Sequence, residues 1–262
     1  MKKIMVFTVV VALLIPALSF ARKAKYEVVE VNNGGGIQGT VKTSLKVKDP
    51  VVPINIQPKE DPKETEIERK TCGKTQQAGI YIVSPSNEVK NVLVIVEGVK
   101  KGKAAPKTDL TINNNKCRFE PLVSISYVKS NYIVKNSDPL FHNTSLGVLL
   151  KDKRRAVYNL ALPYQNQEIK KRNRVAGLID LKCDAHSWMR AYVYSSRHPY
   201  VTITDANGNY ELKDLLPGKY TVRFWHEGFQ EETKEVEVKA GKVSKLDVSF
   251  SKTRKPDFLG RL

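Results

Sequence analysis

Short runs in which apolar and polar residues alternate recur along the chain, separated by Gly, Pro, Asn and Asp. This period of two is typical of half-buried strands. No stretch keeps the three-to-four-residue periodicity of a long amphipathic helix, so we expect an all-β protein of sandwich architecture. The runs that predict strands are 92–96, 123–127, 132–134, 178–183, 191–194, 220–224 and 246–250.

The first 21 residues have the organisation of a secretory signal peptide. Lys2 and Lys3 precede a mostly apolar stretch, 4–18, and residues 19–21 supply small side chains for cleavage after Ala21. The apolar stretch is shorter than the roughly 20 residues that span a bilayer. We expect a periplasmic or otherwise extracytoplasmic protein, and the alternative is an uncleaved membrane anchor.

Residues 22–71 predict one strand followed by a linker. The strand is expected at 36–41, where the sequence reads Gly-Ile-Gln-Gly-Thr-Val. The linker, 46–71, carries four prolines among many Lys and Glu residues, a composition that favours extended, poorly packed chain.

The C-terminal part contains two strong turn sequences. Asn207-Gly208 predicts the tip of a hairpin, and Pro217-Gly218 predicts a second turn. These turns resemble the carboxypeptidase regulatory-like domain, a small transthyretin-like β-sandwich, which we place at 199–252, before a basic tail at 253–262. In that family a Gly-x-Val strand precedes the turn, and the resemblance implies that Gly39-Thr40-Val41 supplies it, with the intervening domain as an insertion.

Four possible metal ligands are spaced along the middle of the chain. Cys183, His186 and Met189 are three residues apart, and strand alternation directs Cys183 into the core. His142 follows the strand predicted at 132–134 and supplies a second imidazole. Two imidazoles, a thiolate and a thioether suit copper better than zinc or hard cations. The alternative is a core cysteine, a loop histidine and a core-filling methionine.

The segment from about 117 to 195 resembles a cupredoxin, with the His142-Asn143 pair, the 177–183 strand and the Cys-x2-His-x2-Met loop in family order. The loop length is similar to that of amicyanin, although Ser187 stands where cupredoxins often carry Pro. The resemblance implies a Greek-key cupredoxin sandwich at 72–198, followed by the smaller transthyretin-like sandwich.

The same resemblance implies one type 1 copper held by His142, Cys183, His186 and Met189. Asn143 would bridge the two ligand-bearing segments, and His186 would expose one ring edge as the site of electron entry. Leu140, Phe141 and Trp188 would form an apolar docking rim around it, with ordinary packing as the alternative.

The function implied is that of a non-catalytic one-electron carrier. The alternatives are a copper-holding or copper-delivering envelope protein and a purely structural β-protein. A multicopper oxidase is disfavoured because four histidines cannot supply a further His-rich cluster. His198 and His226 are expected to be structural, and a second metal site with Glu227 is the alternative.

The number of cysteines and the net charge lead to two further predictions. Of three cysteines, Cys183 is assigned to the metal, so in an oxidising compartment we expect a disulfide between Cys72 and Cys117. The net charge of +17 predicts attraction to polyanions, such as an acidic redox partner or an anionic envelope surface. No nucleic-acid recognition motif is present, and solvated loop charge is the alternative. The oligomeric state is left open.

Overall fold

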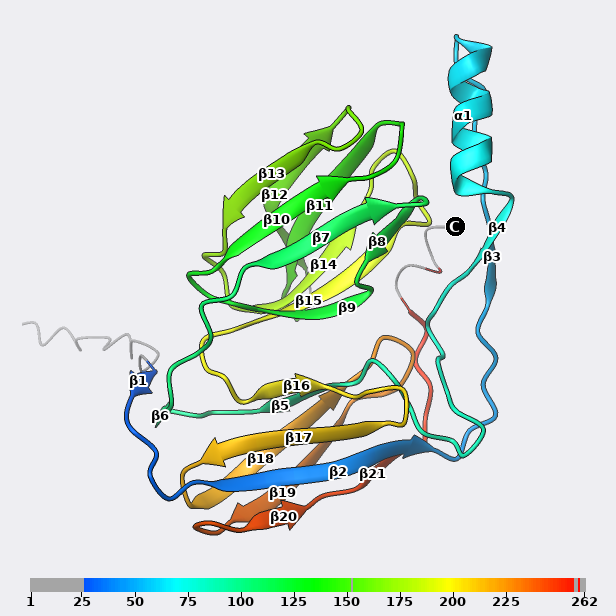
Figure 1. The fold of residues 1–262 in the computed structure, drawn as a ribbon. Coiled ribbons are helices and arrows are strands. Elements are labelled where there is room, and N and C mark those ends of the chain that lie inside the picture. Colours follow the sequence, from blue (N-terminus) through cyan, green and yellow to red (C-terminus); the bar gives the residue numbers. More distant parts are fainter. Residues whose placement is uncertain (1–25, 152, 257–258, 260–262) are drawn as a thin grey trace, which may run out of the picture.

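The computed structural model describes residues 26–151, 153–256 and 259, so the predicted signal peptide and its cleavage site after Ala21 lie outside the described residues. The described part is almost entirely β-strand, with α1 as its single α-helix, and the predicted all-β class is confirmed. Figure 1 shows two stacked β-sandwiches with α1 standing beside the upper one. No described helix is long and apolar enough to span a membrane.

The first sandwich is formed by the middle of the chain. Its sheets have the strand orders β13-β10-β7-β8 and β12-β11-β14-β15-β9. Alternate residues of each strand point into the core between the sheets, where Tyr132, Leu146 and Ile179 are fully buried. The strands are β7 (Leu110–Asn115), β8 (Arg118–Glu120), β9 (Val123–Tyr127), β10 (Asn131–Asn136), β11 (His142–Leu149), β12 (Arg154–Leu162), β13 (Glu168–Arg172), β14 (Gly177–Lys182) and β15 (Arg190–Ser196).

The second sandwich lies below the first in Figure 1 and combines distant parts of the chain. Its sheets have the orders β16-β5-β18-β19 and β17-β2-β20, and β21 also pairs with β2. The strands are β2 (Gly35–Thr43), β5 (Leu93–Val96), β16 (Val201–Ile203), β17 (Asn209–Leu215), β18 (Gly218–Trp225), β19 (Glu232–Val238), β20 (Val243–Lys245) and β21 (Val248–Phe250).

Strand β2 confirms the prediction that the N-terminal Gly-x-Val strand joins the C-terminal sandwich. It pairs antiparallel with β17 and parallel with β20 and β21. Gly39 is required there because a Cβ atom on it would lie 2.0 Å from the carbonyl oxygen of Leu246. The first sandwich is therefore an insertion between strands of the second.

Strand β5 corrects the predicted start of the cupredoxin domain at residue 72. It pairs with β16 and β18, within the second sandwich. Its residues are apolar on both faces because both faces are buried. Val94 and Val96 enter the core of the second sandwich, while Leu93 and Ile95 pack against Tyr192 of the first.

The Asn207-Gly208 turn differs from the hairpin that the sequence predicts. The turn is present, with Gly208 at a positive φ of 67°. However, β16 before it pairs with β5, whereas β17 after it pairs with β2. The turn therefore carries the chain from one sheet of the sandwich to the other.

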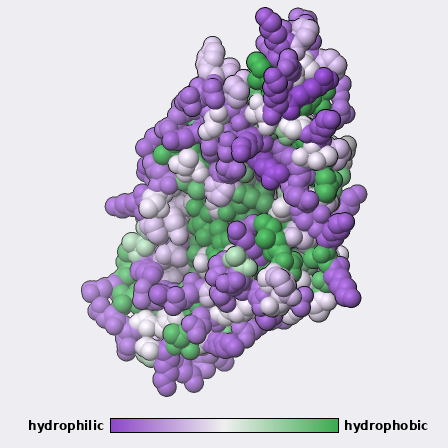
Figure 2. All heavy atoms as spheres, turned by 45° about the vertical axis from the view of Figure 1, so that its right-hand side comes forward, coloured by the Kyte–Doolittle hydropathy of each residue, from purple (hydrophilic) through white to green (hydrophobic). Residues whose placement is uncertain are grey.

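The predicted linker at 46–71 is more ordered than its composition indicates. It contains β3 (Val51–Pro53), which pairs with β4 (Thr75–Gln77), and most of α1 (Pro62–Cys72). Asp61 caps the helix, its side chain accepting from the Lys63 N–H at 2.8 Å. Figure 2 shows the exposed surface of α1 as mostly hydrophilic, above an apolar area in the middle of the same face.

Two further contacts hold the C-terminal end of α1 and the first described strand, β1. Cys72, the last residue of α1, forms the predicted disulfide with Cys117, and the two Cα atoms are 5.1 Å apart. Near the N-terminus, β1 (Glu27–Val28) pairs parallel with β6 (Lys101–Gly102).

Candidate metal centre

Sheet pairing brings His142 and Cys183 to the same edge of the first sandwich. His142 is the first residue of β11, and Cys183 directly follows the last residue of β14. These neighbouring strands run antiparallel, so the start of one lies beside the end of the other. The backbone N–H of Asn143 points at the Cys183 Sγ atom, 3.4 Å away.

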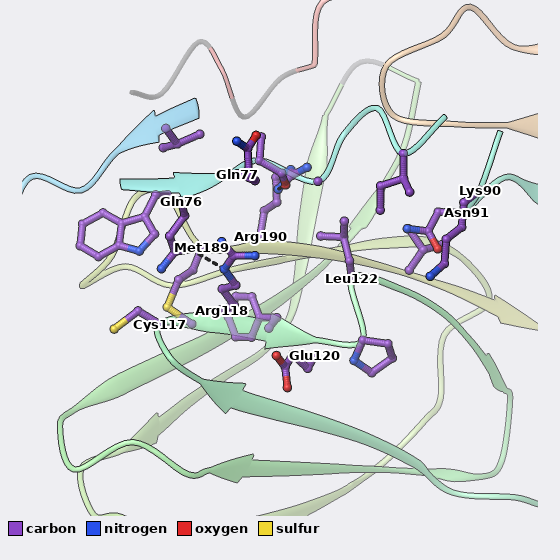
Figure 3. A pocket seen from close by; sticks show the side chains of 18 residues that line it. Gln76, Gln77, Lys90, Asn91, Cys117, Arg118, Glu120, Leu122, Met189 and Arg190 are labelled. Carbon is purple, nitrogen blue, oxygen red and sulfur yellow. Dashed lines mark hydrogen bonds between the residues drawn. The ribbon is translucent and has the colours of Figure 1, made fainter. Parts of the chain in front are cut away.

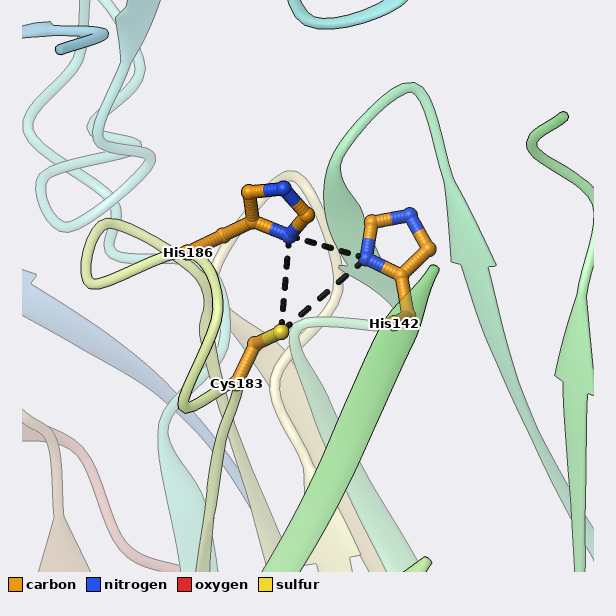
Figure 4. A group of neighbouring side chains, drawn as sticks. All are labelled: His142, Cys183 and His186. Atoms are coloured by element: carbon orange, nitrogen blue, oxygen red, sulfur yellow. Dashed lines mark hydrogen bonds between the residues drawn. The ribbon is translucent and has the colours of Figure 1, made fainter. Parts of the chain in front are cut away.

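His186 completes a cluster of three possible ligand atoms, which Figure 4 shows facing one another. The Nδ1 atoms of His142 and His186 are 3.1 Å apart, and Cys183 Sγ lies 3.4 Å from His186 Nδ1 and 4.0 Å from His142 Nδ1. All three side chains are buried. The arrangement leaves one imidazole nitrogen of each ring and one sulfur directed at a common point.

Met189 belongs to the same loop, which a turn closes. Its backbone N–H donates to the carbonyl oxygen of His186 at 3.0 Å, and its side chain is buried in the same apolar core as Cys183. Figure 3 shows Met189 on the wall of a cavity of about 390 Å³, which Cys117 and Gln76 also line. Ligation by Met189 stays a prediction.

Asn143 lies where the two ligand-bearing segments meet. Its side-chain oxygen accepts from the Asp184 N–H at 3.4 Å, and its side-chain nitrogen donates to Asn159 on β12. Together with the N–H directed at Cys183, these bonds connect the start of β11 to the loop after β14. This is the bridging position that the cupredoxin resemblance implies for Asn143.

His142 and His186 each have a carboxylate beside the second ring nitrogen, Nε2. His142 Nε2 lies 2.8 Å from Asp138 Oδ2, and His186 Nε2 lies 3.1 Å from Glu68 Oε1. A carboxylate accepts a hydrogen bond, so it favours the tautomer with the proton on Nε2. The Nδ1 lone pairs are then free to face Cys183, as a metal ligand requires.

Burial shifts the pKa values of two of the three side chains, His186 and Cys183. It lowers the pKa of His186 to about 4, with a smaller contribution from His142, and it raises the pKa of the Cys183 thiol. For Asp138, burial opposes ionisation, but hydrogen bonds from His142 and two backbone N–H groups outweigh it and lower the pKa. A soft cation would therefore meet a neutral imidazole at His186 and displace one proton from the Cys183 thiol.

The exposure predicted for His186 is wrong. The side chain is only 2% exposed because Glu68 of α1 covers Nε2 and the Trp188 ring lies against the imidazole, with centroids 5.0 Å apart. The predicted docking rim is also incomplete. Leu140 and Trp188 are buried, and only Phe141 is exposed.

Sequence reasoning missed both carboxylates. Asp138 stands four residues before His142, and its position just after a predicted strand could have drawn attention to it. Glu68 is 118 positions from His186 and lies in the segment predicted to be a linker. Nothing local in the sequence connects the two.

Comparison with known families identifies the second sandwich. The carboxypeptidase regulatory-like domain matches residues 191–251. The predicted carboxypeptidase regulatory-like domain is confirmed. The matched range begins in β15, a strand of the first sandwich. It leaves out β2 and β5, which come from earlier in the chain but belong to the second sandwich in the structure.

Solved structures similar to this chain include amicyanin, a purple cupredoxin and a copper-containing nitrite reductase. An oxidised variant of amicyanin is 19% identical over 39% of this chain and 98% of that chain, with a TM-score of 0.30. The purple cupredoxin from Nitrosopumilus maritimus is 20% identical over 34% of this chain and 100% of that chain, with a TM-score of 0.29.

A copper-containing nitrite reductase from Thermus scotoductus is 14% identical over 36% of this chain, with a TM-score of 0.29, and the match spans 24% of the reductase. No curated protein matches the chain.

Among the described residues, neither group of possible metal ligands includes His198, His226 or Glu227. Glu227 forms a bidentate ion pair with Arg190, and His226 Nδ1 accepts from the Gly228 N–H at 3.1 Å. His198 Nδ1 likewise accepts from the Tyr200 N–H at 3.2 Å. These bonds support the structural role predicted for both histidines.

Proposed function

We propose that this protein is an extracytoplasmic one-electron carrier with a single copper ion at His142, Cys183 and His186. The observation that carries the proposal is the buried convergence of two Nδ1 atoms and one Sγ atom, with no pair more than 4.0 Å apart. Soft sulfur together with imidazole is the donor set suited to copper that cycles between two oxidation states. Met189, in the same loop, is the proposed fourth residue that would hold the ion.

Bound copper would supply reversible one-electron oxidation and reduction. The chain's own residues would hold the ligands in one arrangement in both states, because each is fixed from outside the cluster. Asn143 directs an N–H at the Cys183 sulfur, while Asp138 and Glu68 orient the two imidazoles. Burial of all three side chains excludes water from the centre.

The proposed location rests on a separate observation. The Cys72–Cys117 disulfide is of the kind that persists in an oxidising compartment, which supports a periplasmic or otherwise extracytoplasmic site. We propose an acidic protein as the redox partner, because the chain carries a net charge of +17.

A copper-holding protein is the second candidate, and the burial of His186 favours it. At 2% exposure, the ring offers no open edge to a docked electron donor. A holding protein would retain copper tightly and exchange electrons slowly between its own copies. Measuring electron self-exchange in the copper-loaded protein separates the two candidates, since a fast rate supports the carrier and a very slow rate supports the holding protein.

The proposal predicts an intense red-region absorption band in the oxidised, copper-loaded protein, caused by the bond between copper and the Cys183 thiolate. Cys183→Ser should abolish the band, since a hydroxyl does not replace the thiolate. Met189→Leu is the matched control, because it also removes a buried sulfur and should keep the colour. A colourless wild-type protein, or an unchanged spectrum in Cys183→Ser, would contradict the assignment.

A further inference from the structure

Helix α1 covers the histidine that the ligand loop would otherwise expose. His186 is the middle ligand of a short loop at the edge of the first sandwich, where a side chain is normally close to solvent. Here Glu68 Oε1 lies 3.1 Å from its Nε2 atom, and both side chains are buried. The covering group comes from an element 118 positions away in sequence.

The buried face of α1 is almost free of apolar side chains. Thr65, Glu68 and Cys72, spaced three and four residues apart, are its buried residues and form one face. The apolar Ile67 is 41% exposed. Apolar burial therefore contributes little to holding this helix against the first sandwich.

Two specific contacts hold the helix instead. The disulfide from Cys72 fixes its C-terminal end to Cys117 of the first sandwich. In its middle, Glu68 contacts His186 through one oxygen, and Lys59 Nζ lies 2.7 Å from the other. The remaining ion pair of the helix, Glu66 with Lys70, is solvent-exposed and links the helix only to itself.

The Glu68 contact also acts on His186 chemically. A carboxylate at Nε2 keeps the ring proton on that atom and the Nδ1 lone pair directed at Cys183. A buried negative charge beside the ring favours the more positive oxidation state of a metal at Nδ1. Removing that charge should therefore raise the reduction potential.

We propose that Glu68 is a positioning residue of the metal centre and that α1 is a cap, held closed by the contact between Glu68 and His186. The predicted effect of Glu68 on the reduction potential rests on the proposed copper function, whereas the role of α1 as a cap does not depend on a bound metal. When the contact is broken, α1 stays tethered through Cys72 and uncovers His186. The cap thus controls access of solvent and of partners to this ligand.

The cap is tested first without metal. Modification of His186 by diethyl pyrocarbonate, mapped by mass spectrometry, should be slow in the wild type and at least tenfold faster in Glu68→Ala. Glu66→Ala, on the exposed side of the same helix, should leave the rate unchanged. Rapid modification in the wild type, or no acceleration in Glu68→Ala, would overturn the cap whether or not the protein binds copper.

The positioning role is tested with Glu68→Gln, which keeps an oxygen able to accept from Nε2 but removes the charge. Its His186 should stay as protected as in the wild type, while the potential of the copper-loaded protein rises. Glu66→Gln should shift neither quantity. An unchanged potential in a copper-loaded Glu68→Gln protein would overturn the positioning role, and a protein that takes up no copper would instead overturn the proposed function.

Discussion

The four histidines of the chain form two pairs that differ in what their Nδ1 atoms face. His142 and His186 direct Nδ1 at Cys183 and hold Nε2 against a carboxylate. In His198 and His226, Nδ1 instead accepts a backbone N–H from two residues further along the chain. Only the first pair has Nδ1 lone pairs available to a metal, whereas the Nδ1 atoms of the second pair are used within the fold.

His226 should make the stability of the protein depend on pH. Its ring is enclosed by Tyr81, Phe229 and Phe250. Burial, reinforced by the charges of two nearby arginines, lowers its pKa to about 3. In the unfolded chain the pKa is about 6.5, so below that pH the unfolded state binds the proton first. The stability present above pH 6.5 is then lost progressively as the pH falls towards 3.

We expect this residue to contribute up to about 1.4 kcal/mol per pH unit between pH 6 and pH 4. Urea denaturation of the metal-free protein at several pH values measures the slope, and His226→Gln should make it shallower. The carboxylates and the other histidines titrate in both proteins, so they cancel in the comparison. Equal slopes in the two proteins would show that His226 becomes protonated without cost in the folded state.

At the scale of elements, strands were easier to predict than the helix. Apolar alternation indicated β10 and β21 because alternate residues of each strand are buried. The buried face of α1 is polar, so no apolar period marks it. The sequence does contain a local signal for the start of this helix. Asp61-Pro62 followed by Glu64 has the pattern of a helix N-terminus, with a capping residue, a proline in the first turn and an acidic residue three positions after the cap.

The candidate metal centre was likewise only partly predictable from the sequence. His142, Cys183, His186 and Met189 could be proposed because donor types and spacing are visible in the sequence. The carboxylate of Glu68 could not, because its contact depends on how an inserted polar helix docks. The exposure of His186 was mispredicted for the same reason.

The disulfide at the end of α1 should contribute substantially to stability. It closes a loop of 45 residues, and chain entropy assigns such a crosslink about 4 kcal/mol. We expect Cys72→Ala combined with Cys117→Ala to lower the free energy of unfolding by about that amount, measured with a chemical denaturant. Reduced wild-type protein is the matched comparison and should behave like the double variant. A loss below about 1 kcal/mol would mean that the unfolded chain is already compact.

At the scale of the whole molecule, a buried ion pair joins the two sandwiches beside the ligand loop. Arg190, directly after Met189, donates from Nε to Glu227 Oε2 at 2.8 Å and from Nη2 to the other carboxylate oxygen. Its Nη1 donates to the carbonyl oxygen of Ala78 at 2.8 Å. The position of the ligand loop is thereby tied to the carboxypeptidase regulatory-like domain.

Glu227→Gln should destabilise the protein by about 3–5 kcal/mol, because it leaves a buried guanidinium without its counter-charge. Denaturant unfolding measures the loss. The control is Glu231→Gln, which removes a partly exposed partner of Arg223 and should cost less than about 1 kcal/mol. Similar losses in the two variants would show that Arg190 finds compensation elsewhere.

Because β2 pairs with both β17 and β21, the second sandwich cannot be completed until β21 has been synthesised. The first sandwich is continuous in sequence from β7 to β15, so it can fold while the C-terminal strands are still being made. During that interval β2 and β5 have unpaired edges, which are prone to join the strands of other molecules. The protein is thus most vulnerable to aggregation after its first sandwich has formed and before its last strands arrive.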